Sequence, residues 1–323
     1  MMPWLLCGLG LVILLLAGDA LVRGAVNLSL RLGVPALIVS LTIVAFGTSA
    51  PELLIAIKAV AHDADGIALG NVVGSNTANI LMVLGIPAII ATLHTSQCSS
   101  RKSYVFMLMA TVLFIGLAMC GTLTIWSGLI LLVALTFFLG DAFRDARSHR
   151  KNCCAEEGSD ADEEEVLDGL EEADPSMPLW RIGIYLVLGL IGLPLGADLL
   201  VDNATVIARM YHVTETVIGL TLVAIGTSLP ELATTVMATL RRQADVALGN
   251  VIGSNMFNLL AIIGVATFIG PISVDPEFLE FDLWVMLAAS LLIFPFVFLK
   301  KDITRLWGFV LTGLYIGYLM VLF

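Results

Sequence analysis

The chain has 323 residues, of which 59% are hydrophobic and only 13% are charged, and its formal net charge is −11 at pH 7. Soluble domains carry about 25% charged residues, so this composition excludes an ordinary soluble domain. No nucleic acid is expected as a partner.

Apolar runs recur along almost the whole chain, and runs of about 17–25 residues are long enough to cross a bilayer as helices. The first run lacks a basic leading segment and a small-residue cleavage site, which predicts a span rather than a removed signal peptide. We therefore predict an all-α polytopic membrane protein. Its ten expected transmembrane helices cover 4–22, 35–60, 66–90, 104–120, 123–142, 180–208, 214–239, 246–270, 281–299 and 304–323.

The basic residues predict how these spans are oriented. Fourteen of the 16 Lys and Arg residues fall in or beside odd-numbered connections, and only Lys58 and Arg209 fall on the other side. Cytoplasmic connections are enriched in Lys and Arg. Both termini are therefore expected outside, with the connection over 143–178 in the cytoplasm.

That connection contains most of the excess negative charge. Residues 156–174 hold eleven carboxylates and no base, and the rest of the chain has a net charge of zero. Such a run is typical of a solvated connector. A weak calcium sensor is the alternative, but the D-x-D-x-D-G spacing of a calcium loop is absent. The predicted domains are a first half (1–142), an acidic cytoplasmic linker (143–178) and a second half (179–323).

The two halves contain the same sequence. Residues 42–85 and 221–264 align without a gap at a spacing of 179, with 21 of 44 positions identical. Five spans per half place the second copy upside down relative to the first. Two inverted five-helix repeats are an architecture of secondary transporters, whose binding site lies near the middle of the membrane.

Each copy carries a glutamate in an apolar span. An ionisable residue inside a membrane is costly, so its presence suggests a functional site. In the first, TIVAFGTSAPELL, Pro51 removes a backbone donor and frees the Gly47 carbonyl. Thr48 and Ser49 share a helical face with Glu52. Hydroxyl, carbonyl and carboxylate oxygens suit a hard cation such as Ca²⁺ or Na⁺. The alternative is a kinked helix whose glutamate is paired inside the bundle.

The following span, GNVVGSNTANI, adds Ser75 and Asn79, which are four residues apart and share a face. Asn76 lies beside Ser75 and is expected to hydrogen-bond the broken helix. Small residues four apart allow close helix packing, which we predict for Gly70 with Gly74 and for Gly249 with Gly253. The second half repeats the polar positions as Thr227, Ser228, Glu231, Ser254 and Asn258.

The paired motifs GTSAPE with GNVVGSNTAN and GTSLPE with GNVIGSNMFN resemble the two repeats of the calcium/cation antiporter superfamily. The resemblance is to the sodium/calcium exchanger branch and its short prokaryotic members, and it covers both halves. It implies ten helices, alternating access and four cation sites at mid-membrane. The coordinating positions that it implies are Ala45 (through its carbonyl), Thr48, Ser49, Glu52, Ser75 and Asn79, with Ala224 (carbonyl), Thr227, Ser228, Glu231, Ser254 and Asn258 in the second half.

The expected function is therefore electrogenic Ca²⁺ extrusion driven by Na⁺ entry, with the exchange of three Na⁺ for one Ca²⁺ implied by the resemblance. A Ca²⁺/H⁺ antiporter that uses the same glutamates is the nearest alternative. An intramembrane hydrolase and a passive channel are others, but no H-E-x-x-H or G-x-S-x-G motif occurs and we do not expect an enzyme.

The expected partners are the two transported ions and the lipid bilayer. No C-x-x-C motif and no paired His/Cys spacing occurs, so no permanently bound cofactor is expected, and nothing indicates an obligatory protein partner. The short connections suggest the plasma membrane of a prokaryote.

Overall fold

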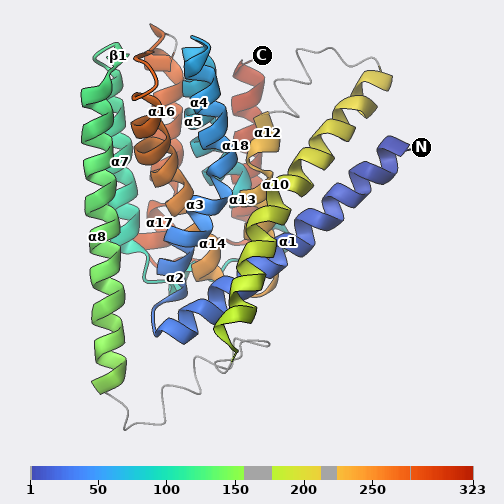
Figure 1. Cartoon of the computed structure of the whole chain (residues 1–323), viewed down its shortest axis with the longest axis vertical. Helices are drawn as coiled ribbons and strands as arrows, with labels where there is room; N and C mark the ends of the chain where they lie inside the picture. Colours follow the sequence, from blue (N-terminus) through green and yellow to red (C-terminus); the bar gives the residue numbers. More distant parts are fainter. Residues whose placement is uncertain (1, 156–176, 212–223, 277, 323) are drawn as a thin grey trace.

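Helices make up nearly all of the computed structural model, which describes residues 2–155, 177–211, 224–276 and 278–322 (Figure 1). The elements are α1 (Met2–Leu32), α2 (Ala36–Val39), η1 (Ser40–Val44), α3 (Ala45–Thr48), α4 (Ala50–Ala61), α5 (Asp65–Ala78), η2 (Asn79–Val83), α6 (Gly85–Ile90), η3 (Thr95–Gln97), α7 (Arg101–Ala118), β1 (Thr122–Leu123), α8 (Ile125–Ala155), α10 (Leu179–Met210), α12 (Ala224–Thr227), α13 (Leu229–Leu240), α14 (Ala244–Met256), η5 (Phe257–Ile262), α15 (Ile263–Ala266), β2 (Ile272–Ser273), η6 (Phe278–Asp282), α16 (Leu283–Leu292), α17 (Phe294–Phe298) and α18 (Arg305–Leu322).

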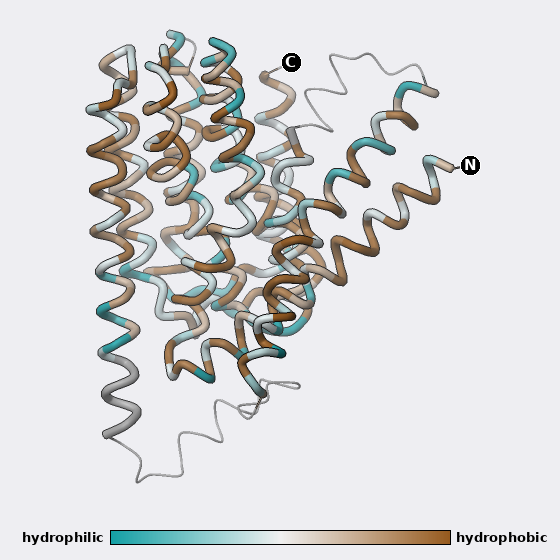
Figure 2. The backbone as a smooth tube through the Cα atoms, viewed as in Figure 1, coloured by the Kyte–Doolittle hydropathy of each residue, from teal (hydrophilic) through white to brown (hydrophobic). Residues whose placement is uncertain are grey.

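The described helices account for nine of the ten predicted spans. Eight of them are long and apolar enough to cross a membrane, and α2–α3 with α4 forms a ninth candidate that is bent by 44°. The seventh predicted span, 214–239, begins outside the described residues and ends in α12 and α13. Hydrophobic residues dominate α1, α7 and the first part of α8, which turns hydrophilic further along the helix (Figure 2). The chain is an all-helical integral membrane protein apart from a two-stranded pairing.

The predicted linker only partly coincides with a described region. Helix α8 continues to Ala155, beyond the predicted end of its span at 142. The acidic run, 156–174, lies outside the described residues.

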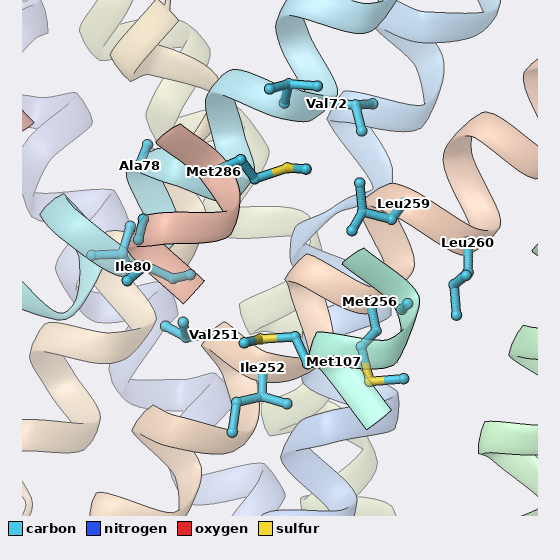
Figure 3. Close-up of a cluster of buried hydrophobic side chains, with 14 of the residues drawn as sticks. Val72, Ala78, Ile80, Met107, Val251, Ile252, Met256, Leu259, Leu260 and Met286 are labelled. Carbon is cyan, nitrogen blue, oxygen red and sulfur yellow. The ribbon is translucent and has the colours of Figure 1, made fainter. Parts of the chain in front are cut away.

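Two segments lie at the centre of the bundle. In Asp65–Ile90 and Ala244–Ala266, 78% and 94% of the residues in the most apolar window are buried, against 17% in α18. Their apolar side chains pack with Met107 of α7 and Met286 of α16 (Figure 3). These central segments also carry the repeated serines and asparagines, so the polar motifs are the most shielded part of the molecule.

Helices α1 and α10 run side by side and lean away from the other helices (Figure 1). They approach closely at glycines: a Cβ on Gly10 would lie 2.7 Å from the Leu200 nitrogen. Asp19 of α1 accepts hydrogen bonds from Arg23 Nε at 2.9 Å and from Arg241 Nε at the end of α13. This ion pair joins the α1/α10 pair to the rest of the bundle.

The connections pair in two places. Strand β1 pairs antiparallel with β2, and Leu93 forms a bridge with Ile303 through two backbone hydrogen bonds of 3.0 Å. The first pairing joins the predicted fourth and eighth connections, and the second joins the third and ninth. Connections of equal parity therefore meet, as expected for helices that cross a membrane in alternating directions.

Two glycines of α14 allow this helix to pack closely against α2 and η1 in the centre of the bundle. A Cβ on Gly249 would lie 2.8 Å from the Leu37 carbonyl oxygen, and one on Gly253 would lie 2.6 Å from that of Leu41. The packing prediction is confirmed for these two glycines. A Cβ on Gly70 would make only an ordinary contact, 3.6 Å from Phe278, and Gly74 meets no described residue within 4 Å.

We predict that Gly253→Ala lowers stability by about 1–3 kcal/mol, because the added methyl group pushes α14 away from η1 and α3. The measurement is the thermal unfolding of the detergent-solubilised protein. Gly116→Ala is the control, because Gly116 is exposed on α7 and has no described neighbour within 4 Å of the added carbon. Equal melting temperatures for the two variants would contradict the packing account.

Candidate functional site

The helices that carry the two glutamates are both broken at a serine. Ser49 separates α3 from α4 with φ −84° and ψ 5°, and Ser228 separates α12 from α13 with φ −89° and ψ 5°. Pro51 and Pro230 follow in the first turn of the new helix, where a proline needs no backbone donor. The predicted breaks are confirmed, and each places a glutamate in the first turn of a helix.

Glu52 and Glu231 lie in the interior and face a common region. Each glutamate is 1% exposed. Ser49 Oγ of the first half lies 3.5 Å from Glu231 Oε1 of the second. Helix N-termini favour negative charge, which stabilises carboxylates in these positions. The structure thus brings the two predicted motifs together.

The central segments supply the facing side of the site. Asn79 begins η2, and Asn258 is the second residue of η5; both are π-helical segments, which occur often at functional sites. Asn258 Nδ2 donates to Ser75 Oγ at 2.9 Å, which joins the two halves again. All of these side chains are 5% exposed or less.

Several predicted ligands present a buried oxygen without a hydrogen-bond partner in the described part of the chain. Leaving such an atom unpaired costs about 1–3 kcal/mol, so a cluster of them indicates a missing positive partner. The atoms are Glu52 Oε2, Asn79 Oδ1, Ser228 Oγ, Glu231 Oε2, Ser254 Oγ and Asn258 Oδ1.

The chemistry of these atoms favours a hard cation. Two carboxylates with amide and hydroxyl oxygens form a donor set that suits Ca²⁺ or Na⁺. The described residues contain no group of three or more His, Cys, Asp or Glu side chains placed to hold a metal ion.

The remaining predicted ligands lie at the helix breaks. The Ala45 carbonyl accepts hydrogen bonds from Thr48 Oγ1 at 3.3 Å and from the Ser49 nitrogen at 3.1 Å. Ala224 begins α12 directly after the undescribed residues, and Thr227 ends this helix and is half-buried.

Sequence reasoning missed a pair of asparagines that hold the glutamate backbones. Asn71 Nδ2 donates to the Glu52 carbonyl at 3.4 Å, and Asn250 Nδ2 donates to the Glu231 carbonyl at 3.3 Å. Asn250 also donates to Thr235 Oγ1 at 3.2 Å. The signal was available, because an asparagine recurs at the same place in both apolar copies.

Asn76 does not make the hydrogen bond that the sequence predicts. Its amide donates to the Asn255 carbonyl of α14 at 3.3 Å and not to the broken helix, because the two central segments lie against each other at this point.

Comparison with known proteins identifies the family of the chain. The sodium/calcium exchanger protein family matches residues 2–141 and 182–323. The chain belongs to this family. Its members are transporters and not enzymes, so the predicted absence of an enzymatic activity is confirmed.

Relatives and solved structures match over nearly the full length. The sodium/calcium exchanger MaX1 of Methanosarcina acetivorans is 33% identical over 98% of this chain and 97% of its own, and the putative antiporter CaxA of Alkalimonas amylolytica is 35% identical over 97% and 96%. A structure of the sodium-calcium exchanger NCX_Mj, soaked with Na⁺ and Sr²⁺, superimposes with a TM-score of 0.81 at 28% identity, covering 99% of this chain and 98% of that one.

We predict that Ca²⁺ raises the thermal stability of the wild-type protein, because a cation that binds between the buried carboxylates stabilises the folded state only. At about 100 times its Kd the stabilisation is about 2.7 kcal/mol. Glu231→Gln should lose most of this effect, whereas Glu280→Gln, the same change at an exposed glutamate, should keep it. A Ca²⁺ effect of equal size in both variants would place the binding site elsewhere.

Proposed function

We propose that the chain is a secondary active antiporter that exchanges Na⁺ for Ca²⁺ by alternating access. The observation that carries the proposal is the pair of buried glutamates, one from each half, with unpartnered oxygens around them. The names of MaX1 and NCX_Mj, both sodium/calcium exchangers, support the choice of ions.

The proposed ligands are the twelve positions that the two motifs supply. Glu52 and Glu231 serve both ions, and the neutral oxygens complete the shells. The neutral ligands are the carbonyls of Ala45 and Ala224 and the side chains of Thr48, Ser49, Ser75, Asn79, Thr227, Ser228, Ser254 and Asn258. No permanently bound cofactor takes part.

Competition for the same carboxylates couples the two ions. The ionised pair gives the site a charge of −2, which one Ca²⁺ neutralises. Three Na⁺ leave a charge of +1, so each exchange moves one net charge across the membrane. Because one charge is worth about 2.3 kcal/mol per 100 mV, a negative interior favours Na⁺ entry and Ca²⁺ exit.

The proposed architecture is ten transmembrane helices in two inverted five-helix repeats, 1–142 and 179–323, joined by the linker 143–178. Contacts that recur at the repeat spacing support it. Asn71 with Glu52 and Asn250 with Glu231 are equivalent pairs, each 19 residues apart. In this arrangement α12 and α13 belong to the seventh span, 214–239, which begins outside the described residues.

The proposed orientation has both termini outside and the linker in the cytoplasm, and the distribution of the basic residues supports it. A prokaryotic plasma membrane is the proposed location, and a relative named inner membrane protein YrbG, from Escherichia coli, supports it. This relative is 33% identical over 97% of the chain.

The test is ⁴⁵Ca²⁺ uptake into proteoliposomes loaded with Na⁺ and diluted into choline, with a proton ionophore present. We expect uptake that needs internal Na⁺ and that falls to background in Glu52→Gln, because the neutral amide cannot balance Ca²⁺. Glu280→Gln, which changes an exposed glutamate, is the matched control and should transport as the wild type does.

The outcomes separate the alternatives. Wild-type uptake in Glu52→Gln would contradict the proposed site. Uptake that fails with the ionophore but is driven by a pH gradient without Na⁺ would assign the chain as a Ca²⁺/H⁺ antiporter. Ca²⁺ flux that needs no counter-ion would indicate a passive channel.

A further inference from the structure

Two buried asparagines outside the proposed ligand set join the central segments. Asn76 and Asn255 are each 1% exposed. Asn76 Nδ2 donates to the Asn255 carbonyl at 3.3 Å, and Asn255 Nδ2 donates to the Asn76 carbonyl at 3.4 Å. Their spacing of 179 is that of the repeated motifs, so the pair lies where the two halves meet.

Their donor contacts also match beyond this pair. The Asn76 amide lies 3.7 Å from Met286 Sδ, and the Asn255 amide lies 3.8 Å from Met107 Sδ. Both methionines belong to the apolar core around the central segments (Figure 3). The donor ends of the two asparagines therefore have equivalent surroundings.

The acceptor ends differ. Asn255 Oδ1 accepts a hydrogen bond from Asn79 Nδ2 at 3.0 Å, whereas Asn76 Oδ1 has no partner among the described residues. Asn258, the equivalent of Asn79, donates instead to Ser75 Oγ at 2.9 Å. Thus the amide of the proposed ligand Asn79 is held by Asn255, whereas the amide of the proposed ligand Asn258 is held by Ser75, which is itself a proposed ligand.

This difference matters because an asparagine amide has a donor end and an acceptor end. Only its oxygen binds a cation, and a reversed amide presents two N–H groups to the ion. With its nitrogen held by Asn255, Asn79 keeps Oδ1 buried and without a partner. A fixed amide orientation lowers the conformational entropy that is lost when the ion binds.

We propose that Asn255 is a positioning residue for the cation site, because it holds the Asn79 amide with its oxygen toward the ion. Asn76, at the equivalent position of the first half, has no such role. The inference rests on the proposed function, since it takes Asn79 as a ligand of the transported cation.

The test compares Asn255→Ala with Asn76→Ala, each alone and combined with Asn79→Ala, by the KM and kcat of Na⁺-driven Ca²⁺ uptake. Both variants lose the same donor contacts, so Asn76→Ala is a matched control. We expect Asn255→Ala to raise the KM about threefold to tenfold, the effect of one hydrogen bond, and Asn76→Ala to leave it nearly unchanged.

The double variants identify the route of the effect. In Asn79→Ala, the further change Asn255→Ala should not raise the KM again, because no amide is left to orient. The proposal would be overturned if the effects of Asn255→Ala and Asn79→Ala on the KM multiplied in the double variant. It would also be overturned if Asn76→Ala raised the KM as much as Asn255→Ala does.

Two further measurements keep the result interpretable. Should Asn255→Ala not fold, Asn255→Leu removes the same acceptor, keeps a side chain branched at the same carbon and takes its place with Asn76→Leu as control. Should the wild type show no Na⁺-driven uptake, the proposed function fails, and Ca²⁺-induced thermal shifts of the same variants test the positioning role on their own, with the same expected order. An unchanged KM in Asn79→Ala would remove that residue from the ligand set and overturn the inference alone.

Discussion

Two carboxylates buried among apolar helices are the constraint on which this structure depends. An uncompensated charge in such a place costs several kcal/mol, so every neighbouring group must either stabilise the carboxylates or leave room for a cation. The bundle does both. The Ser49 hydroxyl faces Glu231 and each glutamate lies in the first turn of a helix, while one oxygen of each carboxyl group has no hydrogen-bond partner among the described residues. A site that is incomplete without positive charge suits a protein that must bind ions and release them.

Local departures from regular helix build this site. Breaks at Ser49 and Ser228 turn the chain so that each glutamate begins a new helix, and the π-helical segments η2 and η5 widen the turns that carry Asn79 and Asn258. Close packing of α14 against η1 and α3, which the absence of a side chain at Gly253 permits, brings these departures together. The irregular backbone is confined to the shielded centre, where protein groups can satisfy it.

Much of this arrangement could be predicted from the sequence, because both apolar periodicity and the effect of proline are local. The spans, the two helix breaks and the packing at Gly249 and Gly253 all follow from residue types within one segment. Contacts between segments could not be predicted in this way. Asn76 shares a face with its own helical neighbours by spacing, but nothing in that spacing identifies Asn255 as its partner. The bond from Asn250 to Thr235 has no equivalent in the first half, where position 56 is alanine.

We propose that one ion is bound by both halves at once. Anomalous diffraction from crystals soaked in Sr²⁺, a Ca²⁺ substitute, tests it most directly. The account predicts a strong peak within coordination distance, about 2.3–2.6 Å for Ca²⁺, of oxygens from both Glu52 and Glu231. A peak bound by residues of one half only, or the absence of any peak between the two glutamates at saturating Sr²⁺, would contradict it.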